Sequence, residues 1–147
     1  MGLVYANIEL VNAWQQEAAK KHLIDKDEVR RMHTTVLVDS GATEMAINEV
    51  IQEIMQFPVA DKRRIRLADE SIITCDVVNC VEIRFENRIC MTQAVVLPDD
   101  TEPLLGAIPM EAMDVIIHPK RQELIIHPEH PEGAVSQLRS IFPYRGE

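Results

Sequence analysis

A carboxylate, a hydroxyl and a glycine end an apolar run in the first third of the chain. The segment VLVDSGATEM, residues 36–45, passes from aliphatic residues directly to Asp39, Ser40 and Gly41. A carboxylate that ends a buried strand is costly unless it is hydrogen-bonded or neutralised. The tripeptide alone is typical of an ordinary turn, in which Asp accepts backbone N–H bonds. The apolar residues on both sides predict that this turn lies inside the protein, where the Asp39 carboxylate would need such partners.

Other residues with chemical potential are less well placed. His118, His127 and His130 each precede a proline, and HPEH could pair two metal ligands. A metal site needs three or four converging ligands, and no cysteine lies nearby at ligand spacing. The sequence therefore predicts no metal and no cofactor, with two histidines at strand ends and one in the tail. Asp114 follows a late helical segment and fits a capping or turn role, with an auxiliary acid as the alternative. The chain has neither a local signature of a nucleophilic cysteine nor a glycine-rich phosphate loop.

Composition narrows the class of protein. The chain has 147 residues, about one domain, and 46% of them are hydrophobic, enough for a core. A formal net charge of −9 argues against a nucleic-acid partner, since nothing neutralises a phosphate backbone. No apolar run approaches the roughly 20 residues of a membrane helix, and the N-terminus lacks a basic signal-peptide region. Three cysteines without a CxxC motif indicate reduced thiols, so we expect a cytoplasmic protein without a membrane partner.

The elements that must position Asp39 are mainly strands. Apolar or β-branched composition predicts strands at residues 3–10 and 33–39, a strand pair over 63–85 that turns at Asp69-Glu70, a strand at 87–98 and a hairpin at 115–128. Helical spacing in NEVIQEIMQF, residues 48–57, with Asn48 as N-cap and Pro58 after the end, predicts a short helix. A second short helix follows Gly106, and residues 13–24 fit either a helix or a hairpin arm. These elements predict one mostly β domain with two short helices.

Two motifs in this order carry a family resemblance. VLVDSGAT, residues 36–43, resembles the active-site loop of retropepsin-like aspartic proteases, and PLLGAIPMEAMD, residues 103–114, is similar to the later segment in which two aliphatics and a glycine precede a short helix. The likeness spans roughly residues 2–128 and looks closest to small single-domain bacterial members. It implies a mostly β, retropepsin-like acid-protease single lobe, with a closed β-barrel-like sheet and two short helices, completed by homodimerisation. The protease domain would cover residues 1–127 with an insertion at 13–27, leaving a tail at 128–147 unexplained.

The resemblance also implies a role for each matching residue. Asp39 would be the catalytic carboxylate, and one motif per chain implies that a homodimer supplies the second. Ser40 would bond the backbone of the partner loop, Gly41 would allow the tight turn and present its N–H to the carboxylate, and Ala42 would help to form the substrate wall. The remaining positions would form a supporting strand and a flap hairpin over the substrate: Leu104, Leu105 and Gly106 in the strand, and Ala68, Asp69, Glu70, Ser71 and Ile72 in the flap.

Two departures from the family pattern keep two functions open. Ser40 stands where Thr is commoner and keeps the hydroxyl, while the flap turn at Asp69-Glu70 has no glycine and carries two acids. The intact Asp39 motif favours an aspartic endopeptidase that hydrolyses peptide bonds with an Asp-Asp dyad formed across the homodimer. The altered flap favours the alternative, a non-catalytic peptide-binding or assembly module with the same dimeric fold.

Overall fold

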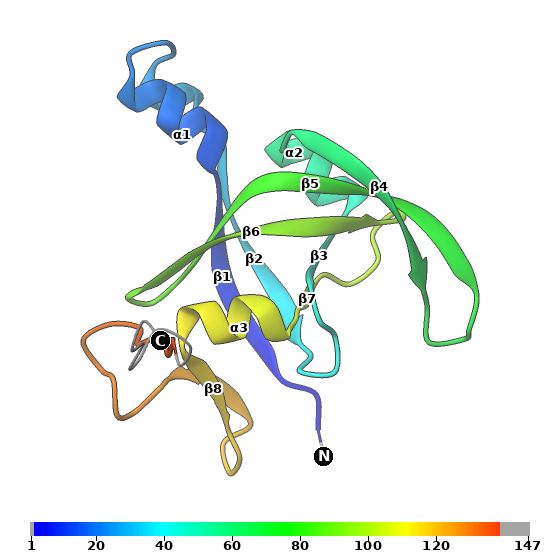
Figure 1. Ribbon diagram of the computed structural model, residues 1–147, viewed down its shortest axis with the longest axis vertical. Helices are drawn as coiled ribbons and strands as arrows, with labels where there is room; N and C mark the ends of the chain where they lie inside the picture. The colour runs from blue at the N-terminus through cyan, green and yellow to red at the C-terminus, as the bar shows by residue number, and fades with distance from the viewer. Residues whose placement is uncertain (1, 139–147) are drawn as a thin grey trace, which may run out of the picture.

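Six strands close into a barrel in the computed structural model, which describes residues 2–138 (Figure 1). The order β1-β2-β7-β3-β6-β5 returns to β1 through a β1–β5 pairing, and β4 extends the sheet beyond β5. A separate two-stranded sheet joins β8 and β9. The strands are β1 (Tyr5–Asn12), β2 (Arg31–Val38), β3 (Met45–Asn48), β4 (Val59–Arg66), β5 (Ile72–Phe85), β6 (Arg88–Leu97), β7 (Leu104–Leu105), β8 (Val115–His118) and β9 (Glu123–Ile126). The predicted mostly β fold with a closed barrel is confirmed.

Three short α-helices accompany the barrel within residues 2–138. The two expected helices are α2 (Glu49–Met55) and α3 (Ala107–Met113). The third, α1 (Ala13–Lys20), resolves the open alternative for residues 13–24 in favour of a helix, so the fold has one helix more than the expected two. As predicted, the Asn48 side chain caps α2 by accepting a bond from the N–H of Ile51 at 2.8 Å. Within residues 2–138, no helix is long and apolar enough to cross a membrane.

Strand alternation places the core inside the barrel. On β1, Ala6, Ile8 and Leu10 are buried while the residues between them face outward, as a period of two requires. Met45 and Met113 are fully buried in the same core, where the flexible methionine side chain fills irregular gaps.

A bulge lets one edge of the long strand β5 pair with two different strands in turn. Its first half pairs with β4 and its second half, from Val81 to Arg84, pairs with β1. The register against β6 shifts between Val78 and Val81, and Cys80 between them has a φ of 62°. Bulges of this kind bend a strand and increase its twist. The first half of β5 can therefore leave the barrel and form the β4–β5 hairpin that projects from it in Figure 1.

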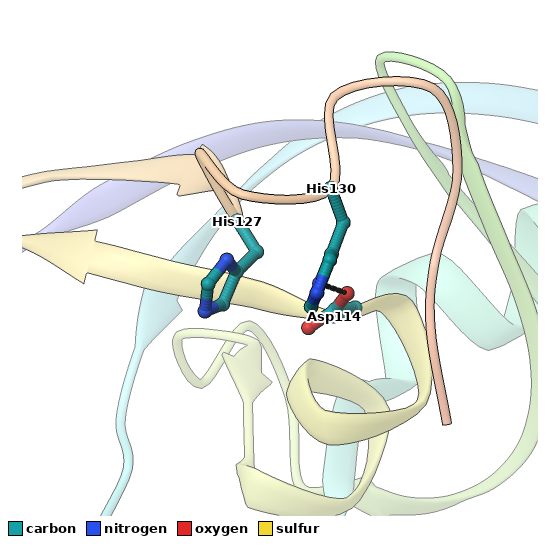
Figure 2. Close-up of side chains that lie close together, drawn as sticks. All are labelled: Asp114, His127 and His130. Atoms are coloured by element: carbon teal, nitrogen blue, oxygen red, sulfur yellow. Dashed lines mark hydrogen bonds and ion pairs between the residues drawn. The ribbon is translucent and has the colours of Figure 1, made fainter. Parts of the chain in front are cut away.

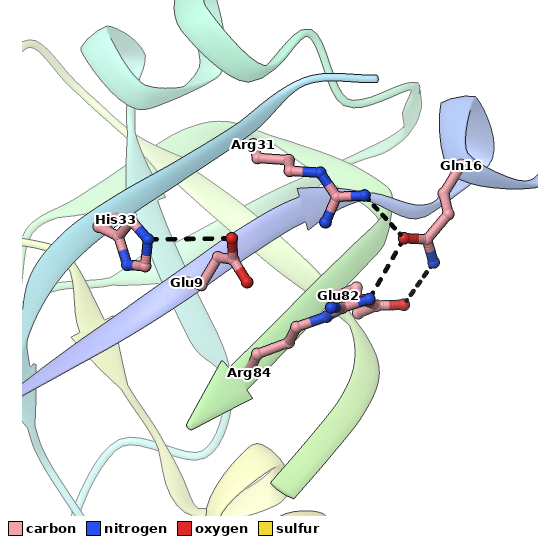
Figure 3. A network of polar contacts seen from close by, with 6 residues as sticks. All are labelled: Glu9, Gln16, Arg31, His33, Glu82 and Arg84. Atoms are coloured by element: carbon pink, nitrogen blue, oxygen red, sulfur yellow. Dashed lines mark hydrogen bonds and ion pairs between the residues drawn. The ribbon is translucent and has the colours of Figure 1, made fainter. Parts of the chain in front are cut away.

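Residues 13–30, which include α1, connect β1 to β2. Polar side chains bind this segment to the barrel (Figure 3). Gln16 on α1 donates to Glu82 Oε1 at 3.1 Å and accepts from Arg84 Nη2 at 3.2 Å, so it binds both members of an ion pair on β5. Glu82 is only 6% exposed, and Arg84 Nε lies 2.6 Å from its Oε2. A buried carboxylate needs such partners. The short 3-10 helix η1 (Lys26–Glu28) completes the segment.

The start of the expected tail contacts the barrel. Arg88 is 1% exposed and donates to the carbonyl of His130 at 2.6 Å, and Asn87 donates to the carbonyl of Pro131 at 2.9 Å. The division at residue 127 between a protease domain and a tail remains a prediction, as does the insertion at 13–27. Residues 139–147 of the expected tail lie outside the described residues.

Candidate active site

Hydrogen bonds from its own loop and from a neighbouring strand hold residue Asp39 in place. Its backbone N–H donates to the carbonyl of Leu105 at 3.0 Å, and its carbonyl accepts from Ala42 N–H at 3.1 Å. The N–H of Gly41 donates to Asp39 Oδ1 at 2.9 Å. This last bond gives the carboxylate a defined orientation and matches the contact that the family resemblance implied for Gly41.

Glycine at position 41 allows this close contact. A Cβ atom there would stand 3.2 Å from Asp39 Oδ1, tighter than an ordinary van der Waals contact. The backbone of Gly41 does not adopt the left-handed conformation that usually selects glycine. Glycine is therefore favoured at position 41 because its lack of a Cβ lets the backbone approach the Asp39 carboxylate.

The segment around Gly106 passes directly beside the loop. β7 runs parallel to β2, with Leu104 opposite Leu37 and Leu105 opposite Val38. Beyond β7, Ala107 N–H donates to the carbonyl of Ala42 at 2.8 Å. A Cβ atom on residue 106 would lie 2.3 Å from the carbonyl oxygen of Glu44 and would clash with it. Only glycine, which has no Cβ, allows the two backbones to approach this closely. The expected strand beside the Asp39 loop is present at Leu104 and Leu105, whereas Gly106, which was expected within it, follows the strand as the N-cap of α3.

The loop lies at the surface of the single chain, and the prediction of an interior turn is wrong in that respect. Val36 and Val38 on β2 are buried, but Asp39 is half-buried and Ser40 and Gly41 are exposed. The apolar neighbours that suggested burial belong to strands that enter the barrel. The turn between them reaches the rim of the barrel.

A cavity of about 500 Å³ lies over this loop. The loop and β3 form one side, the β4–β5 hairpin contributes another, and β6 and β7 supply apolar residues. Its lining residues are Asp39, Gly41, Ala42, Thr43, Glu44, Ala46, Ile65, Arg66, Leu67, Ala68, Val95, Leu97 and Leu104. The fold therefore brings Asp39 and the predicted flap to one cavity. The wider cavity of about 620 Å³ beside α1 shares no residue with it and has no comparable loop, so volume alone does not locate the site.

The glycine-free tip of the hairpin forms a turn by other means. Glu70 adopts a φ of 72°, and Asp69 Oδ1 accepts bonds from the N–H and the hydroxyl of Ser71 at 3.0 and 2.5 Å. The Ser71 hydroxyl and its backbone N–H lower the pKa of Asp69, since both stabilise the charged carboxylate. Of the five expected flap residues, Ala68 lines the cavity. Asp69, Glu70, Ser71 and Ile72 are exposed and lie outside its lining.

An ion pair that the sequence analysis did not single out links the loop to the hairpin. Arg63 Nη1 on β4 bonds Glu44 Oε1, just beyond the Asp39 loop, and both side chains are about one-third exposed. Arg66 also lines the cavity and lies 3.4 Å from Glu70. Glu44 and Arg63 are 19 positions apart in the sequence, so no local pattern indicates the pair.

Comparison with protein families agrees with this geometry. The model of a family described as aspartyl protease matches residues 25–108, which include the Asp39 loop, the β4–β5 hairpin and Gly106. A search of curated proteins found no match. The matched segment is more than half of the chain and carries the whole arrangement around Asp39 described above. The chain belongs to the aspartyl protease family.

Proposed function

We propose that this protein is an aspartic endopeptidase whose active site forms when two copies of the chain bring their Asp39 loops together. The observation that carries the proposal is the Asp39 carboxylate, oriented by Gly41 N–H at the edge of a cavity beneath a β-hairpin. Glu44, the other carboxylate among the described residues that line this cavity, is neutralised by Arg63. One chain therefore supplies one unpaired carboxylate, and the reaction of this family needs two.

The two carboxylates would share one proton. Like charges so close cannot both ionise easily, so one acts as general base while the other stays protonated. The base takes a proton from a water molecule that attacks the scissile carbonyl, and the acid protonates the developing oxyanion. As the C–N bond breaks, the first carboxyl gives its proton to the leaving amine and the second carboxylate takes one back from a diol hydroxyl, so the pair again holds one proton. Activity then requires the singly protonated pair. We expect it to rise from neutral pH to a maximum at about pH 4 to 6 and to fall when both acids are protonated.

The cavity suits an extended peptide with apolar side chains around the scissile bond. Ala42, Ala46, Val95 and Leu104 form apolar walls, and the hairpin adds backbone groups for strand-like pairing. Ile72, which was expected in the flap, lies outside the lining. The acids at the hairpin tip disfavour acidic substrates.

The dimer interface would include the Asp39 loop and a terminal strand. Two terminal strands are candidates for this role, residues 4–10 and residues 123–128. β1 already pairs with β2 on one side and β5 on the other, whereas β9 pairs only with β8 within residues 2–138. A strand with a free edge can pair with another chain. This difference favours β9 as the strand that extends across the interface.

A mixing experiment tests whether two chains share one active site. Wild-type protein and Asp39→Asn are assayed on a peptide library from pH 4 to 7, with Asp100→Asn, an exposed loop position, as matched control. Asp39→Asn should be inactive and Asp100→Asn fully active. Equal amounts of wild type and Asp39→Asn, exchanged to equilibrium, should give about a quarter of the activity of all-wild-type protein, since one dimer in four is intact.

Assembly is measured in parallel by sedimentation. The mutual repulsion of two Asp39 charges opposes association, so Asp39→Asn should dimerise at least as tightly as the wild type above about pH 6. Cleavage that survives Asp39→Asn, or a monomer at high micromolar concentration, would contradict the proposal. Peptide binding by an intact dimer without cleavage would support the alternative, a non-catalytic binding module with the same fold.

A further inference from the structure

Three side chains with metal-ligand chemistry converge at the far end of α3 (Figure 2). Asp114, His127 and His130 each offer a ligand atom, and these atoms all lie within 4.8 Å of one another. The imidazoles of His127 and His130 are stacked with their centroids 4.5 Å apart. All three side chains are partly buried, and none lines the Asp39 cavity.

Backbone contacts hold the three residues together. Asp114 ends α3 in a left-handed conformation with a φ of 56°, so the chain turns sharply into β8. The carbonyl of Asp114 accepts from His127 N–H at 3.0 Å, and the carbonyl of His127 accepts from His130 N–H at 2.9 Å. The cluster therefore joins the end of α3 to the segment after β9, and its geometry does not depend on side-chain placement alone.

The side chains have partners that a metal ion would replace or rearrange. Asp114 Oδ2 lies 2.6 Å from His130 Nδ1 and accepts from Val135 N–H at 3.0 Å. His127 Nδ1 accepts from Glu129 N–H at 3.1 Å. The Val135 N–H and the contact with His130 lower the pKa of Asp114, since both stabilise the charged carboxylate. One carboxylate and two imidazoles whose ligand atoms lie within 4.8 Å of one another form a donor set for a first-row divalent cation.

We propose that Asp114, His127 and His130 bind one divalent transition-metal ion of the Zn²⁺ class. Ligand atoms around a tetrahedral ion stand about 3.3 Å apart at bond lengths of about 2.0–2.1 Å. Rotation of the two imidazoles closes the present spacing to that value, and the Glu129 N–H bond to His127 gives way. His130 also lines a cavity of about 600 Å³ formed by residues 129–135, through which water completes the coordination.

The ion would fasten residues 127–135 to the end of α3. This role is separate from peptide hydrolysis, because an aspartic dyad uses no metal and the cluster shares no residue with the Asp39 cavity. Metal binding should weaken as the pH falls, because protons compete with the metal ion for the donor atoms.

Titration of the full chain, stripped with chelator, tests the site. Zn²⁺ is followed by calorimetry and Co²⁺ by visible absorption at pH 7.5. We expect one equivalent to bind, with at least a tenfold loss of affinity in His127→Gln, His130→Gln and Asp114→Asn. Asn tolerates the left-handed conformation at position 114, so the last variant keeps the fold, which circular dichroism checks. His33→Gln, at an exposed strand position, is the matched control and should bind like wild type.

Three results would overturn the proposal. They are no saturable binding below about 100 μM, binding that survives His130→Gln, and Co²⁺ absorption bands typical of thiolate ligands, which would assign the ion to the cysteines. Melting temperature gives a second measurement. A saturating excess of Zn²⁺ should raise it in wild type and His33→Gln but not in His127→Gln. Peptide cleavage with and without chelator is recorded separately, so failure of the metal site and failure of the aspartic mechanism are distinguishable.

Discussion

Gly106→Ala tests whether the contact between α3 and the Asp39 loop is as tight as the geometry indicates. The added Cβ would lie 2.3 Å from the carbonyl oxygen of Glu44, 2.8 Å from that of Ala42 and 2.9 Å from the carbonyl carbon of Glu44. All three are backbone atoms, so no side-chain rotation relieves the overlap. The Ala42 carbonyl is also fixed by the N–H of Ala107 at 2.8 Å. The two segments must separate to accept the methyl group.

The magnitude follows from this overlap. Overpacking a well-packed site costs about 1–3 kcal/mol, and rigid backbone on one side places Gly106→Ala near the upper limit. For a chain of this length each kcal/mol lowers the melting temperature by about 2–4 °C, so we expect a decrease of about 6–12 °C. Because the Asp39 loop moves with the contact, peptide cleavage should also fall at 25 °C, where the variant is still folded.

Gly133→Ala is the matched control, since a Cβ there meets no atom within 4 Å. Its free energy of unfolding should change by less than about 0.5 kcal/mol. Thermal unfolding of both variants, followed by circular dichroism, gives the comparison. If Gly106→Ala melted within a degree or two of Gly133→Ala, the tight contact beside the loop would be refuted.

The other predictions use single, separate changes. Gly41→Ala should reduce kcat at least tenfold with less than about 1 kcal/mol lost in urea unfolding, because its Cβ meets Asp39 Oδ1 at 3.2 Å while its backbone suits alanine; unchanged kcat would contradict this. Arg63→Met should lower the free energy of unfolding by less than about 1 kcal/mol, as loss of a part-exposed ion pair does. It should also raise KM, because Glu44 and the β4–β5 hairpin are no longer held together; an unchanged KM would show that this ion pair does not position the hairpin. Burial and nearby Glu82 raise the pKa of Cys90 to about 11, so its thiol stays protonated at pH 8. Mass spectrometry should show that iodoacetamide labels Cys90 more slowly than half-buried Cys80. Faster labelling of Cys90 would contradict this prediction. Replacing residues 13–29 with Asn-Gly should leave the barrel folded by circular dichroism, since Val11 and Arg31 already pair across that hairpin; loss of the fold would show that the segment is essential.

Local sequence determined the elements and the loop that carries Asp39. The strand that ends at Asp39, the turn at Asp69-Glu70 and the Asn48 cap depend on alternation, turn chemistry and capping, which act over a few residues. The family pattern then placed Asp39 and Gly106 in one arrangement, and the structure brings their segments into contact.

Tertiary structure alone decided which distant side chains meet. Closure of the barrel through β1 and β5, the Glu44–Arg63 pair and the meeting of Asp114 with His127 and His130 all join positions far apart in the chain. Asp114 by itself fits a helix-ending residue, and two histidines by themselves are too few for a metal. Exposure of the Asp39 turn was decided in the same way, because apolar neighbours in sequence entered the barrel while the turn stayed at its rim. Local patterns fix local conformation, whereas long-range contacts depend on how the whole set of strands packs and closes.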